Sequence, residues 1–323
     1  MTAIPKPIQK KAAKRAAFCL MSLFLLALFL KNSEIAGKAI LSGLLLCVKT
    51  LIPSLFPLMV VSELLVESGL LQRVGKRLKR PVRALFGIEG DAACAVLLGF
   101  VCGFPVGTKC AVALRRKGAL TEAEFSRVLA CSNQPSSAFL IYTVGGAMLG
   151  STRFGLALYL STLLSAILIQ LALRTKQTDK ARSSPPALAP PSPSFPDALA
   201  RAVTQSATAM LSICAFVVFF SALVESLSYL CVGASLSPIA STLLFSLFEM
   251  TGGVSHAALC SPSIAPILCA LSVGWGGLSV HFQLLHLVGD LAFSKRTYFL
   301  TKLAQGVLNV PLFLLLLRWM GES

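Results

Sequence analysis

The sequence predicts an all-α polytopic membrane protein with two inverted repeats, each containing a re-entrant helical hairpin and a broken helix. Hydrophobic residues make up 55% of the 323 residues and charged residues only 13%, about half the usual charged fraction of a soluble domain. Basic residues gather between long apolar segments, and glycines and prolines interrupt those segments at matching places in the two halves. The apolar runs are continuous, which indicates helices rather than the alternating strands of a membrane barrel.

The net charge of +16 would suggest nucleic-acid binding in a soluble protein. Here the basic clusters follow the positive-inside rule, so we interpret them as a topology signal and expect no nucleic-acid partner. The ten cysteines form no CxxC pair, and the three histidines stand in no ligand motif, so no metal or cofactor is expected. No nucleophile–base pair or paired carboxylate has useful spacing, and the chain is therefore predicted not to be an enzyme.

The first elements are an anchor and a bent span. Residues 1–37 are expected to form a basic, cytoplasmic N-terminus followed by an uncleaved anchor helix over 16–30. A long span over 39–66 comes next, and its two prolines are expected to bend it. The basic loop at 73–83 then marks the cytoplasmic side of the membrane.

Residues 91–118 are predicted to enter the membrane and return, turning at Gly103–Lys109. A single crossing would leave three basic residues outside, whereas a hairpin keeps both flanks inside. A capping box then opens an amphipathic helix over 121–131, expected at the membrane interface. The polar residues 133–137 break the next span, and 154–173 is a clean transmembrane helix.

The second half repeats this order after a proline-rich, cytoplasmic linker at 183–196. The two repeats cover 38–182 and 197–323, and their basic flanks give them opposite orientations. The predicted segments of the second repeat are 206–230, 239–260 broken at 249–253, 264–290 broken at 274–283, and 298–317. Inverted repeats with discontinuous helices are typical of secondary transporters, whose substrate site lies near the midplane where the breaks converge.

The candidate substrate-binding residues lie in these four breaks, where half-helix N-termini offer free N–H groups to an anion. They are Gly103, Pro105, Gly107, Thr108, Lys109, Asn133, Gln134, Ser136, Ser137, Glu249, Thr251, Gly252, Gly277, Ser279, His281 and Gln283. Lys109 either pairs with an anionic substrate or extends its ammonium to the interface. Glu249 is interpreted as functional, because a carboxylate inside a membrane is costly.

For several other residues a structural role is an alternative to substrate binding. Thr108 and Thr251 have a packing role as a fair alternative to binding, whereas the two amides at 133–134 favour a functional break. Ser279, His281 and Gln283 alternate as in an unwound strand that faces a cavity, although His281 is equally compatible with a structural role. The ionisable residues Lys49, Glu63 and Glu225 are assigned to interfaces.

Five motifs resemble those of the YlbJ (stage V sporulation protein V) family of sporulation integral membrane proteins, which carries the nucleoside recognition, or Gate, domain. The similarity covers most of residues 38–317. The motifs are Leu51-Ile52-Pro53-Ser54-Leu55-Phe56-Pro57, Gly103-Phe104-Pro105-Val106-Gly107-Thr108-Lys109, Cys131-Ser132-Asn133-Gln134, Glu249-Met250-Thr251-Gly252 and Gly276-Gly277-Leu278-Ser279-Val280-His281. The order of spans also resembles the concentrative nucleoside transporter core.

This resemblance implies a membrane protein of endospore formers, located in the outer forespore membrane and moving dipicolinic acid toward the forespore. The expected partners are therefore a small anionic solute and membrane lipid. A nucleoside-type carrier and a non-transporting scaffold of the spore envelope are the alternatives. The residues by themselves indicate no coupling ion, direction of transport or oligomeric state.

Overall fold

The computed structural model describes residues 6–68, 77, 80, 82, 83, 87, 92–173, 194–232 and 236–321. Every regular element in these ranges is a helix. The helices of the first half are α1 (Lys6–Lys31), α2 (Ser33–Leu46), η1 (Cys47–Leu51), α3 (Ile52–Glu67), α6 (Ala92–Val101), α7 (Val106–Arg116), α8 (Glu122–Ser132), η2 (Phe139–Met148) and α9 (Thr152–Ala172). The later helices are α10 (Phe195–Val232), α11 (Pro238–Phe248), α12 (Met250–Ala257), α13 (Ala265–Trp275), α14 (Gly277–Val288) and α15 (Lys295–Trp319).

Five helical stretches are long and apolar enough to cross a membrane. They are Ser33–Leu65, Thr152–Ala172, Phe195–Leu230, Ala265–Val288 and Lys295–Trp319. Helix α1 covers the segment that is expected to anchor the chain, but it is not one of these five stretches. The all-α, multi-pass membrane character predicted from composition is confirmed.

The first long span is a single helix with a local change of winding. The π-helical segment η1 joins α2 to α3, and Pro57 lies inside α3. Proline lacks the N–H that the preceding turn needs, and a π-helical turn shifts the hydrogen-bond register. The bend that the prolines predict stays a prediction, and these two features are the irregularities that the structure shows along this span.

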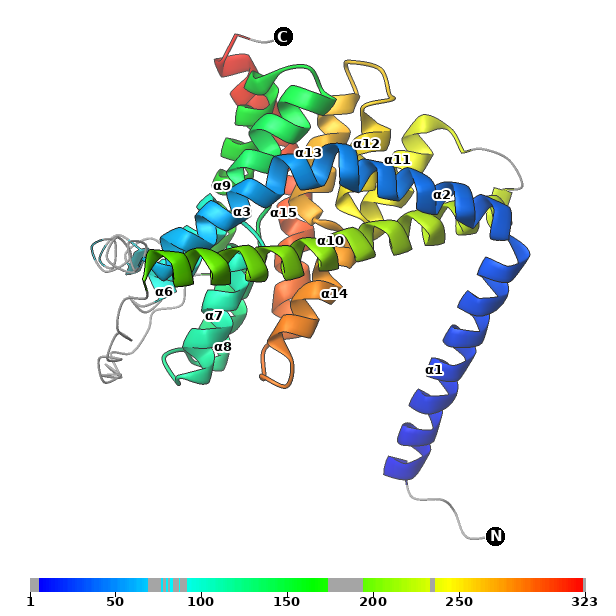
Figure 1. Cartoon of the computed structure of the whole chain (residues 1–323), viewed down its shortest axis with the longest axis horizontal. Coiled ribbons are helices and arrows are strands. Elements are labelled where there is room, and N and C mark those ends of the chain that lie inside the picture. Colours follow the sequence, from blue (N-terminus) through cyan, green and yellow to red (C-terminus); the bar gives the residue numbers. More distant parts are fainter. Residues whose placement is uncertain are drawn as a thin grey trace.

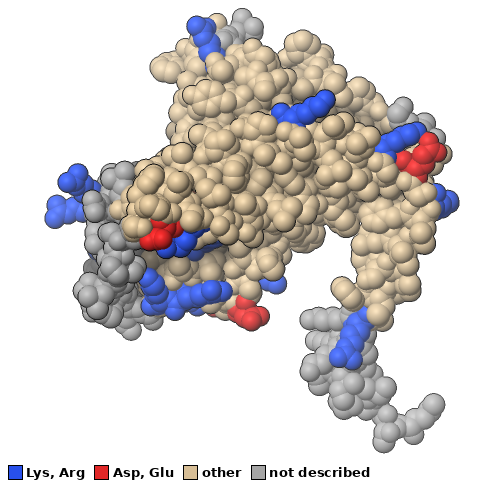
Figure 2. Space-filling model, viewed as in Figure 1, with Lys and Arg blue, Asp and Glu red and all other residues tan. Residues whose placement is uncertain are grey.

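The long helices α2 and α3 pack against α10. Figure 1 shows the two long rods side by side, running in opposite directions and crossing over α14 and α15, while α1 projects away. Large apolar side chains on these helices are exposed, including Leu41 on α2 and Leu211 and Phe219 on α10. The face in Figure 2 is correspondingly poor in charge along these rods, as expected for a surface that contacts lipid.

Two hairpins and one pair of long helices accompany these rods. Helices α6 and α7 pack against each other, as do α11 and α12, so both predicted hairpins are present as paired short helices. The predicted closing spans α9 and α15 also lie in contact. This arrangement brings the ends of the short helices into the interior of the molecule.

One predicted location is wrong. The amphipathic helix expected at the membrane interface is α8, and its residues from Glu124 to Ser132 are all buried. Phe125, Val128 and Leu129 belong to a core cluster that also includes side chains of α6, α7 and α14. The low hydrophobicity of α8 therefore reflects buried polar contacts within the protein rather than contact with lipid headgroups. Most of the predicted basic loop and of the linker lie outside the described residues.

Candidate functional site

Four helix breaks line one cavity of about 230 Å³. The breaks lie between α6 and α7, between α8 and η2, at Glu249 before α12, and at Gly276 before α14. Helices α3 and α10 close the cavity with apolar residues such as Leu55, Met59 and Val217. A space of this size is at the small end of ligand pockets, which run from about 300 Å³ for drug-sized molecules, and suits a compact solute.

The breaks contact each other in pairs, and one glycine in each pair shows how close the two backbones are. Gly103 has φ of +75°, and a Cβ there would lie 2.5 Å from the Ser136 nitrogen. Gly277 has φ of +79°, and a Cβ there would lie 2.8 Å from the Met250 nitrogen. Only glycine accepts both this backbone conformation and this approach. The first break is thus held against the second, and the third against the fourth.

The break after α8 is polar, and its two amide side chains are buried. Asn133 and Gln134 are 2% and 1% exposed and both line the cavity. Pro135 follows them, and its ring disfavours helical backbone at the preceding residue. The Gln134 side chain donates to the carbonyls of Ala130 and Cys131, at 3.3 and 3.1 Å, which helps to satisfy the end of the broken helix. Ser136 and Ser137 also face the cavity.

The break before α12 is capped by a carboxylate. Glu249 is 2% exposed, has extended backbone and accepts hydrogen bonds from the Thr251 N–H at 2.9 Å and from the Gly252 N–H. A side-chain acceptor at this position satisfies N–H groups that a helix start leaves without partners. The positive end of the helix dipole also favours its negative charge. Glu249 and Thr251 both line the cavity.

The break before α14 differs from the prediction. Ser279, His281 and Gln283 lie in a helix, not in an unwound strand. Residues four apart share a helix face, so Ser279 and Gln283 line the cavity together and His281 does not. His281 is buried instead, with its Nδ1 2.8 Å from the hydroxyl of Tyr298. Gly276 caps α14 without a side-chain hydrogen bond.

Lys302 was missed in the sequence. This lysine on α15 is 1% exposed and lines the cavity. Its Nζ donates to the backbone oxygen of Asn133 at 3.0 Å and to Oε1 of Gln305 at 2.6 Å. The Gln305 amide in turn donates to Oε1 of Gln134 at 2.8 Å. The signal was available, because a lysine inside a predicted span is unusual and Gln305 lies one turn further along the same helix.

Lys109 lies outside the cavity lining. Its Nζ is 3.5 Å from Oε1 of Glu63 on α3, and its side chain is 35% exposed. The Glu63 side chain is only 8% exposed, so the pair ties the first hairpin to the first long helix. Both interpretations of Lys109 from the sequence overlooked this carboxylate, which lies 46 positions earlier in the chain and was assigned to an interface.

The other predicted residues have backbone or packing positions. Thr108 is fully buried. Gly107 packs closely against α6, because a Cβ added at Gly107 would lie 2.5 Å from the Gly99 Cα. Pro105 precedes α7 at its N-terminal end. Gly252 contributes its N–H to the Glu249 cap. In the described ranges, no group of three or more His, Cys, Asp and Glu side chains is placed to hold a metal.

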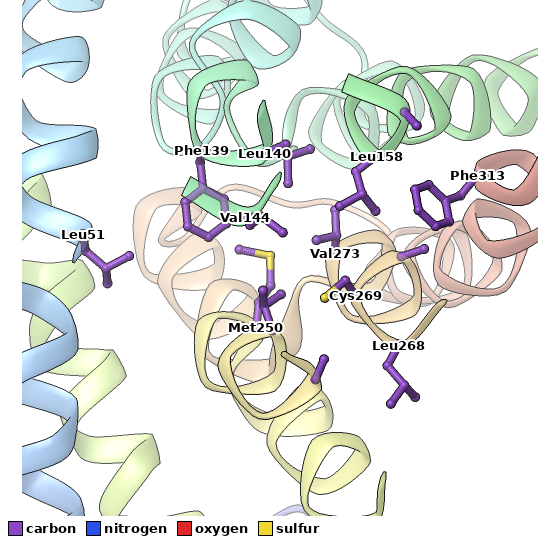
Figure 3. Close-up of a cluster of buried hydrophobic side chains, with 14 of the residues drawn as sticks. Leu51, Phe139, Leu140, Val144, Leu158, Met250, Leu268, Cys269, Val273 and Phe313 are labelled. Carbon is purple, nitrogen blue, oxygen red and sulfur yellow. The ribbon is translucent and has the colours of Figure 1, made fainter. Parts of the chain in front are cut away.

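Apolar side chains join the cavity to the core. Leu51, Phe139, Met250 and Val273 line the cavity and also belong to a large hydrophobic cluster. Figure 3 shows these side chains converging from four different segments, with Phe139 and Met250 close to the centre. The cavity lining therefore combines apolar side chains with two amides, a carboxylate and an ammonium.

Comparison with known proteins agrees with the motifs. Residues 48–173 match the family model described as Gate, nucleoside recognition. Over 328 residues the chain is 25% identical to the sporulation integral membrane protein YlbJ of Bacillus subtilis strain 168, a match that covers 91% of this chain and 80% of that protein. No solved structure matches the chain. Both comparisons therefore confirm the resemblance that the motifs predicted.

Proposed function

We propose that the chain carries a small organic anion, dipicolinate, across a membrane by alternating access of two inverted halves. The observation that carries this proposal is the meeting of four helix breaks in one cavity. Non-helical backbone at membrane depth persists only where protein or a water-filled cavity surrounds it. A structural scaffold needs no such breaks, and a carrier uses them to bind its solute.

The pattern of helix contacts supports two inverted halves, covering 38–182 and 197–323. Helix α8 touches α15, and its proposed counterpart α13 touches α9; likewise α7 touches α14, and α12 touches η2. For each of these contacts between the halves, the corresponding helices of the opposite halves are also in contact. The antiparallel course of α3 and α10 in Figure 1 agrees with this relation.

The chemistry of the cavity favours an anion with a flat apolar body. The N-terminus of α14 reaches the cavity without a side-chain cap, and free N–H groups with the positive end of a helix dipole attract negative charge. The apolar wall from α3 and α10 suits an aromatic ring. Dipicolinate, a rigid aromatic dicarboxylate, combines both features. The relative YlbJ is described as a sporulation integral membrane protein, which supports a role in sporulation, and we place that role at the outer forespore membrane as part of this proposal.

Uptake into liposomes tests this function. The purified full-length chain is reconstituted, and labelled dipicolinate is added outside. Saturable uptake that excess unlabelled dipicolinate suppresses is expected. Uptake equal to that of protein-free liposomes would contradict the proposal and favour a scaffold.

A nucleoside-type solute is the second candidate, because the matching family model is described by nucleoside recognition. Uridine and adenosine added in excess distinguish the two. We expect them to leave dipicolinate uptake unchanged. Labelled nucleosides that enter in place of dipicolinate would favour the second candidate.

A further inference from the structure

The cavity contains a buried ammonium without a carboxylate partner. Lys302 is 1% exposed, and in the described part of the chain no carboxylate oxygen lies within the 4.0 Å of an ion pair from its Nζ. Two other lysines do have a carboxylate partner: Lys38 pairs with Glu34, and Lys109 pairs with Glu63. Lys302 is thus more buried than either and lacks the counter-charge that both have.

The neighbours of Lys302 stabilise its charge only in part. Its two acceptors are neutral oxygens, from the Asn133 backbone and the Gln305 amide. An ammonium has three N–H donors, so one donor has no acceptor among the described residues. Burial of a charge is costly unless it is paired as well as hydrogen-bonded. An ionisable side chain that is kept inside a membrane protein under these conditions indicates a functional contact.

The nearby carboxylate is already engaged. Glu249 lines the same cavity, but its two oxygens accept the N–H groups of Thr251 and Gly252 at the start of α12. The two charged groups of the cavity, Glu249 and Lys302, therefore differ in how they are stabilised. The negative charge is held by a helix N-terminus, and the positive charge faces the cavity with a donor to spare.

We propose that Lys302 pairs directly with a carboxylate of the solute and makes the cavity selective for anions. This inference rests on the proposed transport function and assigns the cation of its site. The solute carboxylate would take the remaining ammonium donor as a charge-assisted hydrogen bond, which is stronger than a neutral one. Pairing would also compensate the buried charge, so that the loaded cavity is less costly to enclose than the empty one.

The test compares a charged and a neutral probe of the same shape. The full-length chain and its Lys302→Met, Lys302→Arg and Lys49→Met variants are purified in detergent and titrated with dipicolinate and with pyridine-2,6-dicarboxamide. Lys49 offers a matched control, because it is an exposed lysine on η1 outside the cavity lining. Folding of each variant is checked by its apparent unfolding temperature and by gel filtration.

We expect Lys302→Met to bind dipicolinate about 30-fold more weakly or worse, as for loss of one partner of a buried charged pair. Lys302→Arg should keep most of the affinity, because the positive charge is retained. The neutral diamide should bind Lys302→Met as well as the wild type, and Lys49→Met should bind both probes normally. An equal loss for both probes would mean that Lys302 only supports the α8 break, and would overturn the proposal.

Failure of the lysine assignment and failure of transport are distinguishable. Normal dipicolinate binding and uptake by Lys302→Met would refute the role of the lysine while leaving the carrier function intact. Absence of both binding and uptake in the wild type would refute the carrier function and with it the lysine assignment. If Lys302→Met does not fold, the Lys302→Gln variant with the same two probes decides the question.

Discussion

The two hairpins occupy corresponding places in the chain but present different chemistry to the cavity. The first hairpin contributes Val101, Cys102 and Phe104, and its lysine is turned to Glu63 on α3. The second contributes Glu249, Met250 and Thr251, with the carboxylate at the start of α12. One break is therefore closed by close backbone packing and the other by a charged cap.

This difference teaches that two hairpins of similar design need not have matching roles. The cavity charges come from the second half, through Glu249 and Lys302, whereas the amides of Asn133 and Gln134 come from the first. A site of this kind is assembled between the halves. A solute held there would contact both halves, as alternating access requires.

The largest expected effect is on the packing of the first hairpin. In Gly99→Ala, the new Cβ would overlap the backbone of Ser132 at the end of α8, and overpacking of this kind should destabilise the protein by about 3 kcal/mol. The apparent unfolding temperature in detergent measures it. Gly37→Ala is the control, because a Cβ there meets nothing within 4 Å. Equal behaviour of the two variants would contradict the close contact with α8.

The next effect concerns the cap of the second hairpin. Glu249→Ala removes the acceptor for two buried N–H groups and should cost about 2 kcal/mol, near the top of the range for helix caps. Glu249→Gln keeps one amide oxygen as acceptor and should lie between alanine and wild type. Thermal unfolding gives the ranking. An alanine variant as stable as the wild type would mean that the carboxylate does not hold α12.

The smallest effect is expected at the hairpin-to-helix ion pair. Lys109→Ala leaves the buried Glu63 without its cation, which should cost about 1 kcal/mol for a pair with one partly exposed partner. The double variant Lys109→Ala with Glu63→Gln should recover part of that loss. The KM for dipicolinate should stay close to the wild-type value in both. A large rise in KM would indicate that Lys109 contacts the substrate after all.

The sequence predicted the helices better than the contacts of their side chains. The break at Glu249, the capping box of α8 and the clean span α9 are all local patterns, and local patterns can be read from neighbouring residues. The membrane class followed from composition, because a chain so rich in apolar residues needs a lipid environment.

The errors have a common physical origin, which is contact between distant segments. Lys109 was assigned from its hairpin alone, although Glu63 on another helix decides its position. His281 was placed by a strand-like alternation, whereas the helical period of α14 turns it away from the cavity. Lys302 contacts Asn133 across 169 positions of sequence, a pairing that no local pattern contains.

The most direct test of the account is a counterflow measurement. Liposomes that contain the full-length chain are preloaded with unlabelled dipicolinate and diluted into a trace of labelled dipicolinate. A carrier with one alternating site exchanges the two, so labelled dipicolinate should accumulate transiently inside above the level of vesicles loaded with buffer. Entry that does not depend on preloading, or no entry beyond protein-free vesicles, would contradict transport through a single cavity that opens to each side in turn.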